Sequence, residues 1–149
     1  MRALIQRVKL GQVTIDCRIH GKISSGLVIL LGITHADSAD DVDYLVNKCL
    51  NLRIFGDEDK RMNQSLLDIQ GEVLIVSQFT LYGNAAKGRR PSFTDAAEPQ
   101  HALELYERFV AAVKAAGISV ATGKFGAEMV VSIVNDGPVT MMLESPPQS

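Results

Sequence analysis

The sequence predicts an α/β fold in which mixed, mostly antiparallel β-sheets pack together and two main helices cover one side. The first observation behind this prediction is the order of the elements: two strands, two strand–helix units and then three strands. An even alternation of strands and helices would give a doubly wound parallel sheet, but here too many strands meet without a helix between them. The second observation is the length of 149 residues, which suits one domain and is tight for two separate cores.

Apolar patterns place the first three strands. Residues 3–10 are expected to form a strand that Gly11 ends, and residues 13–15 then belong to a second strand with one solvated face. His20-Gly21 is expected to form a tight turn. Residues 26–34 are apolar almost throughout, which predicts a strand that is buried on both faces.

The middle of the chain predicts a helix and a buried strand. Ser38 begins the helix, and Asp41, three residues later, is a partner of the capping-box type. Apolar residues then recur at helical spacing as far as Leu50, and Cys49 among them is most simply a core residue. Residues 72–81 are expected to form a strongly apolar strand that ends in polar residues.

A second helix and three strands complete the chain. Residues 82–97 form a loop of a length that is usually functional or disordered. Pro99 suits the first turn of a helix that Gly117 ends. The last three strands are expected at residues 118–122, 128–134 and 139–143. We therefore expect one domain over residues 1–144 and a short tail, residues 145–149, that frays.

Composition and charge exclude several classes of protein. Fifteen basic and seventeen acidic residues give a net charge of −2, which excludes a strongly basic nucleic-acid-binding protein but not a local basic patch. Cys17 and Cys49 form no CxxC and have no histidine at ligand spacing, which argues against zinc and against a disulfide framework. Arg2 and Arg7 interrupt any signal-peptide core, and the apolar run at 27–31 is too short to span a membrane. We expect a cytoplasmic protein.

The familiar catalytic motifs are absent from the sequence. No serine lies in a GxSxG motif, and the chain has neither a Walker nor a Rossmann glycine pattern. No two histidines have the i, i+4 spacing of a metal site, so we expect no metal and no cofactor. A Ser–His–Asp triad assembled only in three dimensions stays open, and the alternative is that the three histidines, His20, His35 and His101, are ordinary surface residues.

Residues 77–81, with the sequence Ser-Gln-Phe-Thr-Leu, are harder to explain by folding alone. Three side chains that can form hydrogen bonds follow directly on a buried apolar strand. Because buried polar groups are costly unless they are satisfied, this strand end is a candidate pocket. The alternative is a strand terminus whose hydroxyl groups cap the next loop.

Two further segments are candidates for function. Residues 135–140, Asn-Asp-Gly-Pro-Val-Thr, carry a strong turn signal, and the simple interpretation is a hairpin connection. A cis Gly137–Pro138 bond is accessible to this sequence but not implied by it. The loop at residues 87–93 carries three cations in four residues, which suits phosphate binding, and the alternative is a solvated loop.

Taken together, these segments resemble the D-aminoacyl-tRNA deacylase family. Residues 77–81 match the first signature of that family and residues 135–140 match its second. Further matches lie at residues 3–8, 52–55 and 87–93, so the resemblance covers nearly the whole chain. It implies hydrolysis of the ester between a D-amino acid and the terminal adenosine of tRNA, and removal of glycine mischarged on alanine tRNA. It also implies a homodimer, a three-layer α/β/β fold and no need for a metal.

The resemblance also assigns roles to residues. In the family, the pair that corresponds to Gly137–Pro138 is cis. It projects from one subunit into the active site of the other and rejects an L side chain. Arg7 braces this pair, and Met129 forms a pocket wall. The basic loop, with Lys87, Arg89 and Arg90, would face the tRNA acceptor stem.

In the first signature, the catalytic segment would comprise Ser77, Gln78, Phe79 and Thr80. Backbone N–H groups near Phe79 and Thr80 would form an oxyanion site, and the 2′-hydroxyl of the tRNA itself would take part in the chemistry. Gln78 and Thr80 would then hold and orient the substrate. A sister branch of the family has Pro and Ala in place of Ser77 and Phe79, so this chain resembles the strict chiral branch.

Two other functions remain open at this point. One is a dimeric nucleic-acid-binding module that keeps the fold without deacylase activity. The other is a small serine hydrolase that uses Ser77, which requires a histidine within hydrogen-bonding reach.

Overall fold

A long antiparallel pair of strands runs through the molecule. In the computed structural model, which describes residues 1–147, β1 (Arg2–Ile15) pairs with β8 (Val130–Glu144) from Arg2 opposite Glu144 to Thr14 opposite Val130. On its other edge, β1 pairs first with β3 (Gly26–Gly32) and then with β2 (Arg18–Ile23). This strand therefore joins both halves of the sheet.

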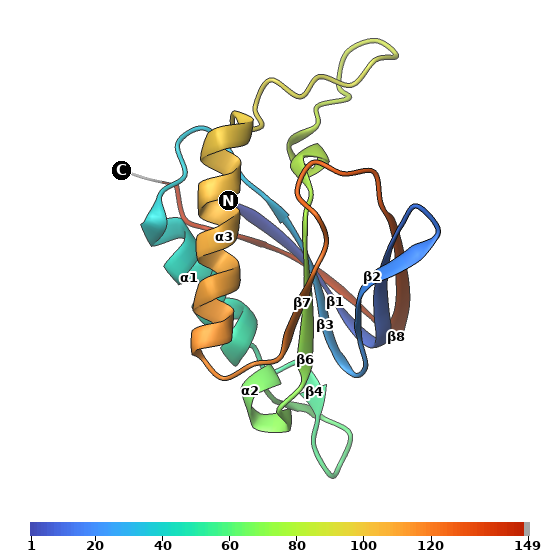
Figure 1. Cartoon of the computed structure of the whole chain (residues 1–149). Coiled ribbons are helices and arrows are strands. Elements are labelled where there is room, and N and C mark those ends of the chain that lie inside the picture. Colours follow the sequence, from blue (N-terminus) through green and yellow to red (C-terminus); the bar gives the residue numbers. More distant parts are fainter. Residues whose placement is uncertain (148–149) are drawn as a thin grey trace.

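The remaining strands extend the sheet until it curls back on itself. β6 (Glu72–Ser77) pairs in parallel with β3, and β7 (Val120–Thr122) pairs in parallel with β6. β7 then approaches β2 so closely that a Cβ added at Gly21 would lie 2.8 Å from the carbonyl oxygen of Thr122. The two β layers are thus parts of one strongly curved sheet (Figure 1).

The helices lie together on one side of this sheet (Figure 1). α1 (Ala39–Asn51) packs against α3 (Pro99–Ala115). The short α2 (Leu66–Ile69) and the two-stranded hairpin of β4 (Phe55–Gly56) and β5 (Met62–Gln64) lie at one end. The predicted fold class, a mixed α/β architecture with two main helices on one side and a three-layer α/β/β order, is confirmed. None of the helices within residues 1–147 is long and apolar enough to cross a membrane.

Two hydrophobic cores fill the spaces between the layers. The larger core lies between the helices and the sheet and includes Phe109, Leu45 and Ile75, all fully buried. The smaller core lies inside the curl of the sheet and includes Val28 and Leu74. Because alternate residues of β3 and β6 enter different cores, both strands are apolar without a break, as predicted for residues 26–34.

Helix α1 begins as the sequence predicts. Ser38 is the N-cap, and its backbone N–H donates to Asp41 Oδ2 at 2.8 Å in a capping box. Cys49 lies on the inward face and is fully buried, and this burial raises the pKa of its thiol to about 12. The prediction that Cys49 is a core residue is confirmed, and its raised pKa leaves the thiol protonated near neutral pH.

Two glycines that were expected to break strands are instead needed for close packing. β1 continues through Gly11, where a Cβ would lie 2.7 Å from Val28 Cγ2. His20 and Gly21 lie inside β2, so the predicted turn there is wrong. The chain reverses at Asp16 and Cys17, whose φ angles are 49° and 62°. Sequence patterns do not separate a glycine that bends the chain from one that makes room for a neighbour.

The C-terminal part also differs from expectation. The strands predicted at residues 128–134 and 139–143 are one continuous strand, β8. Ser145, which was placed in a fraying tail, is hydrogen-bonded, since its backbone N–H donates to the Met1 carbonyl at 3.0 Å. The last two residues of that predicted tail lie outside the described part of the chain.

Candidate active site

The first candidate segment lies where β6 leaves the sheet. The strand ends at Ser77, and Phe79–Tyr82 form a 3₁₀ helix, η1, so the predicted strand as far as residue 81 is wrong at its end. The reason is a lack of partners: β7 pairs with β6 only up to Ile75, and β3 ends at Gly32. The backbone N–H of Gln78 makes a last bond to the Leu31 carbonyl at 2.8 Å. Beyond it the polar residues leave the sheet together.

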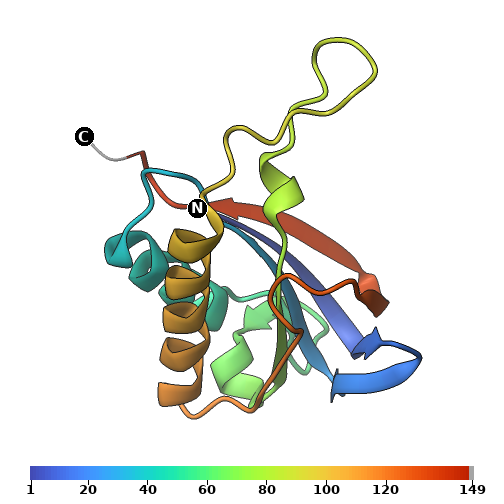
Figure 2. The same cartoon turned by 45° about the horizontal axis from the view of Figure 1, so that its top comes forward.

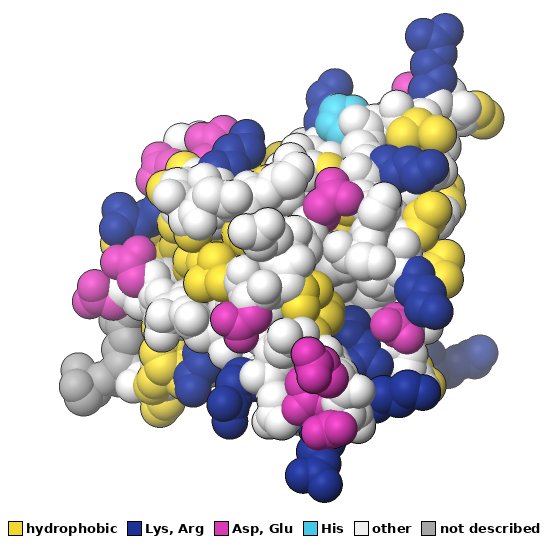
Figure 3. Space-filling view, turned by 90° about the horizontal axis from the view of Figure 1, so that it is seen from below, with side chains coloured by type: hydrophobic (Ala, Val, Ile, Leu, Met, Phe, Trp, Pro, Cys, Tyr) yellow, Lys and Arg dark blue, Asp and Glu magenta, His cyan; other side chains and the backbone are white. Residues whose placement is uncertain are grey.

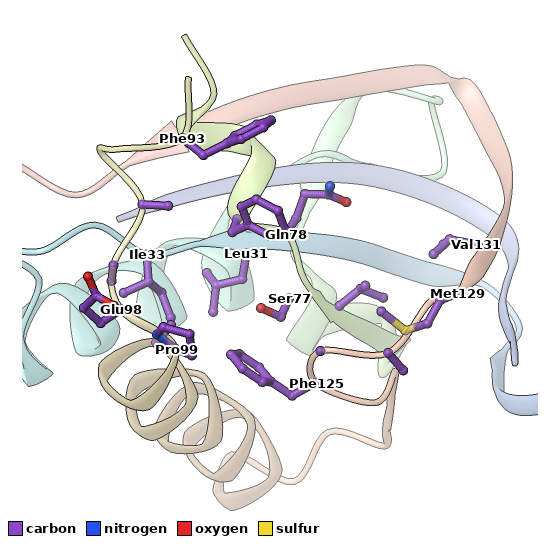
Figure 4. Close-up of a pocket in the computed structure, with 17 residues that line it drawn as sticks. Leu31, Ile33, Ser77, Gln78, Phe93, Glu98, Pro99, Phe125, Met129 and Val131 are labelled. Atoms are coloured by element: carbon purple, nitrogen blue, oxygen red, sulfur yellow. The ribbon is translucent and has the colours of Figure 1, made fainter. Parts of the chain in front are cut away.

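A pocket of about 650 Å³ opens at this strand end. Its walls come from the end of β6, the start of α3 and the segment at residues 125–131, and most of them are apolar. Figure 4 shows Pro99 and Met129 at opposite ends of the pocket, with Ser77 and Gln78 between them. An apolar cavity of this size with a few polar groups is typical of a site for a small molecule or a single nucleoside.

Gln78 and Phe79 line this pocket, and Thr80 follows them directly in the chain. The Gln78 Nε2 amide donates a hydrogen bond to the hydroxyl oxygen of Thr80. Within residues 1–147, the backbone N–H groups of Phe79 and Thr80 donate to no other group of the chain. Two unpaired N–H groups at the start of a 3₁₀ helix can stabilise a developing negative charge on oxygen.

Arg2 of β1 contacts η1, and Tyr106 of α3 contacts the strand that precedes it. Arg2 Nη1 donates to the Leu81 carbonyl at 2.9 Å, and the guanidinium of Arg2 lies 4.5 Å from the centre of the Tyr82 ring. Burial, and then the charge of Asp37, raises the pKa of Tyr82. Below the site, the Tyr106 hydroxyl of α3 donates to the Ile75 carbonyl at 2.8 Å, and burial raises the pKa of this phenol to about 12. These contacts fix the strand end relative to the helix.

The structure gives Ser77 no histidine partner. His35 Nε2 is bonded to the Thr94 carbonyl at 2.7 Å, and His101 Nε2 is bonded to the Asp37 carbonyl at 2.9 Å. None of the three histidines lines the pocket, and none is bonded to Ser77 within the described chain. The hypothesis of a serine hydrolase therefore fails on geometry. Among the described residues, no group of three histidine, cysteine or acidic side chains could hold a metal ion.

The second candidate segment is a bulge within β8, and the hairpin predicted there is wrong. Thr140 pairs with Gln6 and Asn135 pairs with Val8, so four residues of β8 lie opposite Arg7 alone. The Gly137–Pro138 bond within this bulge is cis, and both residues are exposed. The polar turn-forming residues of this segment thus push the backbone outward while the strand continues.

Arg7 holds this bulge in place. Its Nε donates to the Asp136 carbonyl at 3.2 Å, and its Nη1 donates to the Ile54 carbonyl at 2.7 Å. The Asp136 carboxylate also lies 3.5 Å from Arg7 Nε. Gly137 and Pro138 do not line the pocket of their own chain, so one copy of the chain does not bring its two candidate segments together.

The third candidate segment forms the tip of an arm that extends away from the body of the molecule (Figure 2). Two backbone hydrogen bonds between Asn84 and Ser92, at 2.7 and 2.8 Å, close the arm at its base. Lys87, Arg89 and Arg90 are exposed on it and take part in no ion pair within residues 1–147. By contrast, the face seen in Figure 3 mixes basic and acidic side chains.

The structure brings Ser77, Gln78, Phe79 and Met129 into the lining of one pocket, whereas Thr80 is not part of that lining. Sequence reasoning missed Glu98, whose side chain lies at the rim directly before α3, and Phe125, which forms a wall. The signal for Glu98 was present: Pro99 marks the first turn of the helix, so the residue before it had to lie at a helix start. Phe125 had no comparable signal.

Comparisons with known proteins agree over nearly the whole chain. A family model described as D-Tyr-tRNA(Tyr) deacylase matches residues 4–144. The D-aminoacyl-tRNA deacylase of Clostridioides difficile (strain 630) is 56% identical over 145 residues, which is 97% of each chain. That of Thermus aquaticus is 57% identical over 145 residues, 97% of this chain and 95% of the relative.

Two solved structures are also similar. One, described as "c-Myc DNA Unwinding Element Binding Protein", has a TM-score of 0.92 at 40% identity and covers 99% of this chain and 100% of its own. Another, described as "Structural Analysis of a probable eukaryotic D-amino acid tRNA deacylase", has a TM-score of 0.82 at 22% identity. It covers 96% of this chain and 98% of its own, and it supports the fold.

Proposed function

The chain belongs to the D-Tyr-tRNA(Tyr) deacylase family, and from this premise we propose that the pocket at the end of β6 is its active site. The protein is a hydrolase that acts on the ester bond of D-aminoacyl-tRNA and releases free tRNA and the D-amino acid. One observation carries the assignment of the site. Residues 77–80 bring two backbone N–H groups, unpaired within the described chain, and a bonded Gln–Thr pair to the edge of an apolar pocket.

In this proposal the terminal adenosine enters the apolar pocket, and the ester carbonyl lies against the N–H groups of Phe79 and Thr80. These groups stabilise the oxyanion that forms when water adds to the carbonyl carbon. The bond between that carbon and the ribose oxygen then breaks, and the ribose oxygen takes a proton. The neighbouring 2′-hydroxyl of the tRNA assists the reaction, and none of the described histidines lines the pocket to serve in its place.

Gln78 and Thr80 orient the substrate in this mechanism. Their mutual hydrogen bond fixes the rotamer of both side chains, which leaves the Thr80 hydroxyl hydrogen free to donate to a substrate oxygen. Ser77 and Met129 complete the walls on either side of the bound nucleoside. The protein then contributes position and charge stabilisation, which together account for large parts of enzymatic rate enhancement.

We further propose that the enzyme is a homodimer and that Gly137–Pro138 of the partner subunit closes the site. Two features support an arrangement across subunits. The pair is exposed and lies outside the pocket of its own chain. The outer edge of β8 has no strand partner within residues 1–147, and its side chains Val134 and Met142 are 50% and 44% exposed. Exposed apolar edge strands are typical docking surfaces.

This arrangement explains how the enzyme would discriminate between substrates. A rigid backbone segment against the substrate α-carbon rejects an L side chain and admits a D side chain. Glycine has no side chain to reject, so the same site would also remove glycine mischarged on alanine tRNA. Arg7 keeps the segment in place through its bonds to Asp136 and Ile54.

The chiral assay tests these proposals directly. Purified protein is incubated with D-tyrosyl-tRNA and with L-tyrosyl-tRNA, with and without a chelator, and release of the amino acid is followed. We expect rapid loss of the D ester alone, at the same rate in both conditions. Loss of both esters would contradict the Gly137–Pro138 filter, and inhibition by the chelator would contradict a reaction supported by the tRNA hydroxyl.

A second candidate function is a nucleic-acid-binding module of the same fold without deacylase activity. It is favoured by the DNA-binding name of the solved structure that is 40% identical and by the cations of the arm, which have no ion-pair partner within residues 1–147. The same assay separates the two functions, because a binding module would retain tRNA but release no amino acid from either ester.

A further inference from the structure

Two exposed phenylalanine rings meet at the mouth of the pocket. Phe79 and Phe93 have ring centres 5.2 Å apart at an angle of 72°, and both side chains line the pocket. They are 56% and 38% exposed, although each is large and apolar. Figure 4 shows Phe93 at the rim, above Gln78. Apolar area that remains exposed beside a binding pocket indicates a contact surface for a ligand.

The surrounding chain holds this pair of rings in place. A Cβ at Gly83 would lie 2.9 Å from Phe93 Cε1 and 2.9 Å from the Thr80 carbonyl oxygen, so Gly83 leaves the space that the ring occupies. The Asn84–Ser92 hydrogen bonds fix the chain immediately before Phe93. The Ala96 backbone N–H donates to the Phe93 carbonyl at 3.1 Å and fixes the chain after it. The rings therefore form a prepared surface rather than a loose loop tip.

The charge beside the rings selects the kind of ligand. Between residues 79 and 94 the chain carries three cations, Lys87, Arg89 and Arg90, and no acidic residue. Aromatic rings next to a cluster of cations are the combination that binds single-stranded nucleic acid, because the rings stack on bases and the cations contact phosphates. An apolar peptide or a membrane would not require this arrangement.

We infer that the Phe79–Phe93 pair stacks the base that precedes the terminal adenosine of tRNA. The inference rests on the proposed function, in which the terminal adenosine fills the pocket. A volume of about 650 Å³ suits one nucleoside, so the next nucleotide leaves through the mouth and meets the two rings. Beyond them, the strand reaches the cations of the arm. The enzyme thus reads the shape of the single-stranded 3′ end without reading its sequence.

Three substrates and two variants test this inference. The substrates are D-tyrosyl-tRNA, the D-tyrosyl ester of cytidylyl-adenosine, which has the last two nucleotides, and the D-tyrosyl ester of adenosine alone. Phe93→Leu removes the aromatic face but keeps an apolar side chain, and Phe93→Tyr keeps the face. For the first two substrates we expect Phe93→Leu to raise KM about 5- to 100-fold with kcat nearly unchanged, since stacking on an aromatic ring contributes about 1–3 kcal/mol per base.

The adenosine ester is the internal control. Its KM should rise much less in Phe93→Leu than the KM of the other two substrates, because Phe93 borders the adenosine pocket only at its mouth. Phe93→Tyr, which keeps the aromatic face, should restore most of the affinity for the two longer substrates. A direct measurement supports the kinetics: the fluorescence of 2-aminopurine at the position before the terminal adenosine should be quenched on binding to the wild-type protein and much less on binding to Phe93→Leu.

Several results would overturn the inference. An equal loss on all three substrates would mean that Phe93 only shapes the adenosine pocket. No loss on any substrate would mean that the base lies elsewhere. If light scattering gave a different assembly mass for Phe93→Leu than for the wild-type protein, the two rings would be part of a contact between subunits. If the wild-type protein releases no D-tyrosine from tRNA, the proposed function itself fails. Failure of the stacking inference looks different, because the wild-type protein would then still be active.

Discussion

Arg7 and Gly137 lie so close together that a Cβ added at Gly137 would be 2.9 Å from a terminal guanidinium nitrogen of Arg7. The backbone of Gly137 has a φ of 124°, which L side chains rarely adopt. The same Arg7 side chain donates to the Asp136 carbonyl just before it. The position of the exposed Gly137–Pro138 segment thus depends on one residue of β1 and on the absence of a side chain in β8.

The first prediction concerns Gly137→Ala. The new methyl group must displace Arg7 and adopt an unfavourable backbone conformation, which costs about 1–3 kcal/mol. We expect a loss of stability of that order in urea denaturation and a lower ratio of D- to L-tyrosyl-tRNA hydrolysis. The exposed Val130→Ala, at the start of the same strand and outside the bulge, is the control for general effects on β8. A D/L ratio equal to wild type in Gly137→Ala would contradict the proposed filter.

The second prediction concerns Arg7→Lys. A lysine keeps the charge but cannot reach the Asp136 and Ile54 carbonyls in the planar geometry of the guanidinium. Loss of one hydrogen bond to a charged group lowers the free energy of unfolding by about 1.5–3 kcal/mol. We expect this loss of stability together with increased hydrolysis of L-tyrosyl-tRNA, while the rate with D-tyrosyl-tRNA changes less. A uniform fall with both substrates would instead assign Arg7 a purely structural role.

The third prediction concerns Thr80. If the hydroxyl only orients the substrate, Thr80→Ala should lower kcat/KM by about 10- to 100-fold, far less than the roughly 10⁶-fold loss that follows removal of a nucleophile in a triad. Thr80→Ser keeps the hydroxyl and should restore most of the rate. Intact mass spectrometry during turnover should detect no acyl-enzyme, and trapping one would refute this mechanism.

The fourth prediction concerns the arm. The double variant Arg89→Glu, Arg90→Glu should weaken tRNA binding and reduce the dependence of log Kd on log salt concentration by about 0.7 for each lost phosphate contact. Thermal stability should stay the same, because both side chains are exposed and make no ion pair within residues 1–147. The double variant Lys60→Glu, Arg61→Glu changes the charge by the same amount in the turn between β4 and β5, at the opposite end of the molecule, and is the matched control (Figure 1). Equal affinity for tRNA at low salt would show that the arm does not contact it.

The fifth prediction concerns alkaline pH. Burial raises the pKa of Cys49 from 9.0 to about 12, so between these values the folded chain keeps a proton that the unfolded chain has lost. The free energy of unfolding must therefore fall as the pH rises above 9. Between pH 9 and 10, the wild-type protein should lose about 1 kcal/mol more than Cys49→Ala. Parallel pH profiles for the two proteins would contradict the burial of the thiol.

Local sequence patterns were sufficient to predict the elements whose formation depends only on residues close together in the chain. The helix from Ser38, the helix from Pro99 and the doubly buried strand near residues 26–32 were all predictable, because capping, fixed backbone angles and unbroken apolar runs act over a few residues. The errors lie at Gly11 and Gly21, at the strand end after Ser77, at the Asn-Asp-Gly-Pro segment and at Ser145. Gly11 and Gly21 accommodate neighbours that are distant in sequence, Val28 and Thr122, which no local pattern reveals.

The site divides in the same way. Residues 77–80 indicated a pocket because polar side chains follow directly on a buried apolar strand, and buried polar groups need hydrogen-bond partners. Glu98 and Phe125 entered the same pocket only through the packing of α3 and of the segment after β7. The pocket volume and the free N–H groups of Phe79 and Thr80, which have no acceptor within residues 1–147, depend on where β3 and β7 end.

The sequence by itself determined the α/β class, the two helices, the buried strands and the residues of the three candidate segments, since each of these follows from side-chain chemistry over a short stretch. Only the tertiary structure decided that Asn135–Thr140 is a bulge opposite Arg7, that Phe79 and Phe93 form one surface, and that Gly137–Pro138 lies outside the pocket of its own chain. Those relationships join residues from about 14 to more than 100 positions apart. They are set by strand register and by packing, which depend on the whole chain at once.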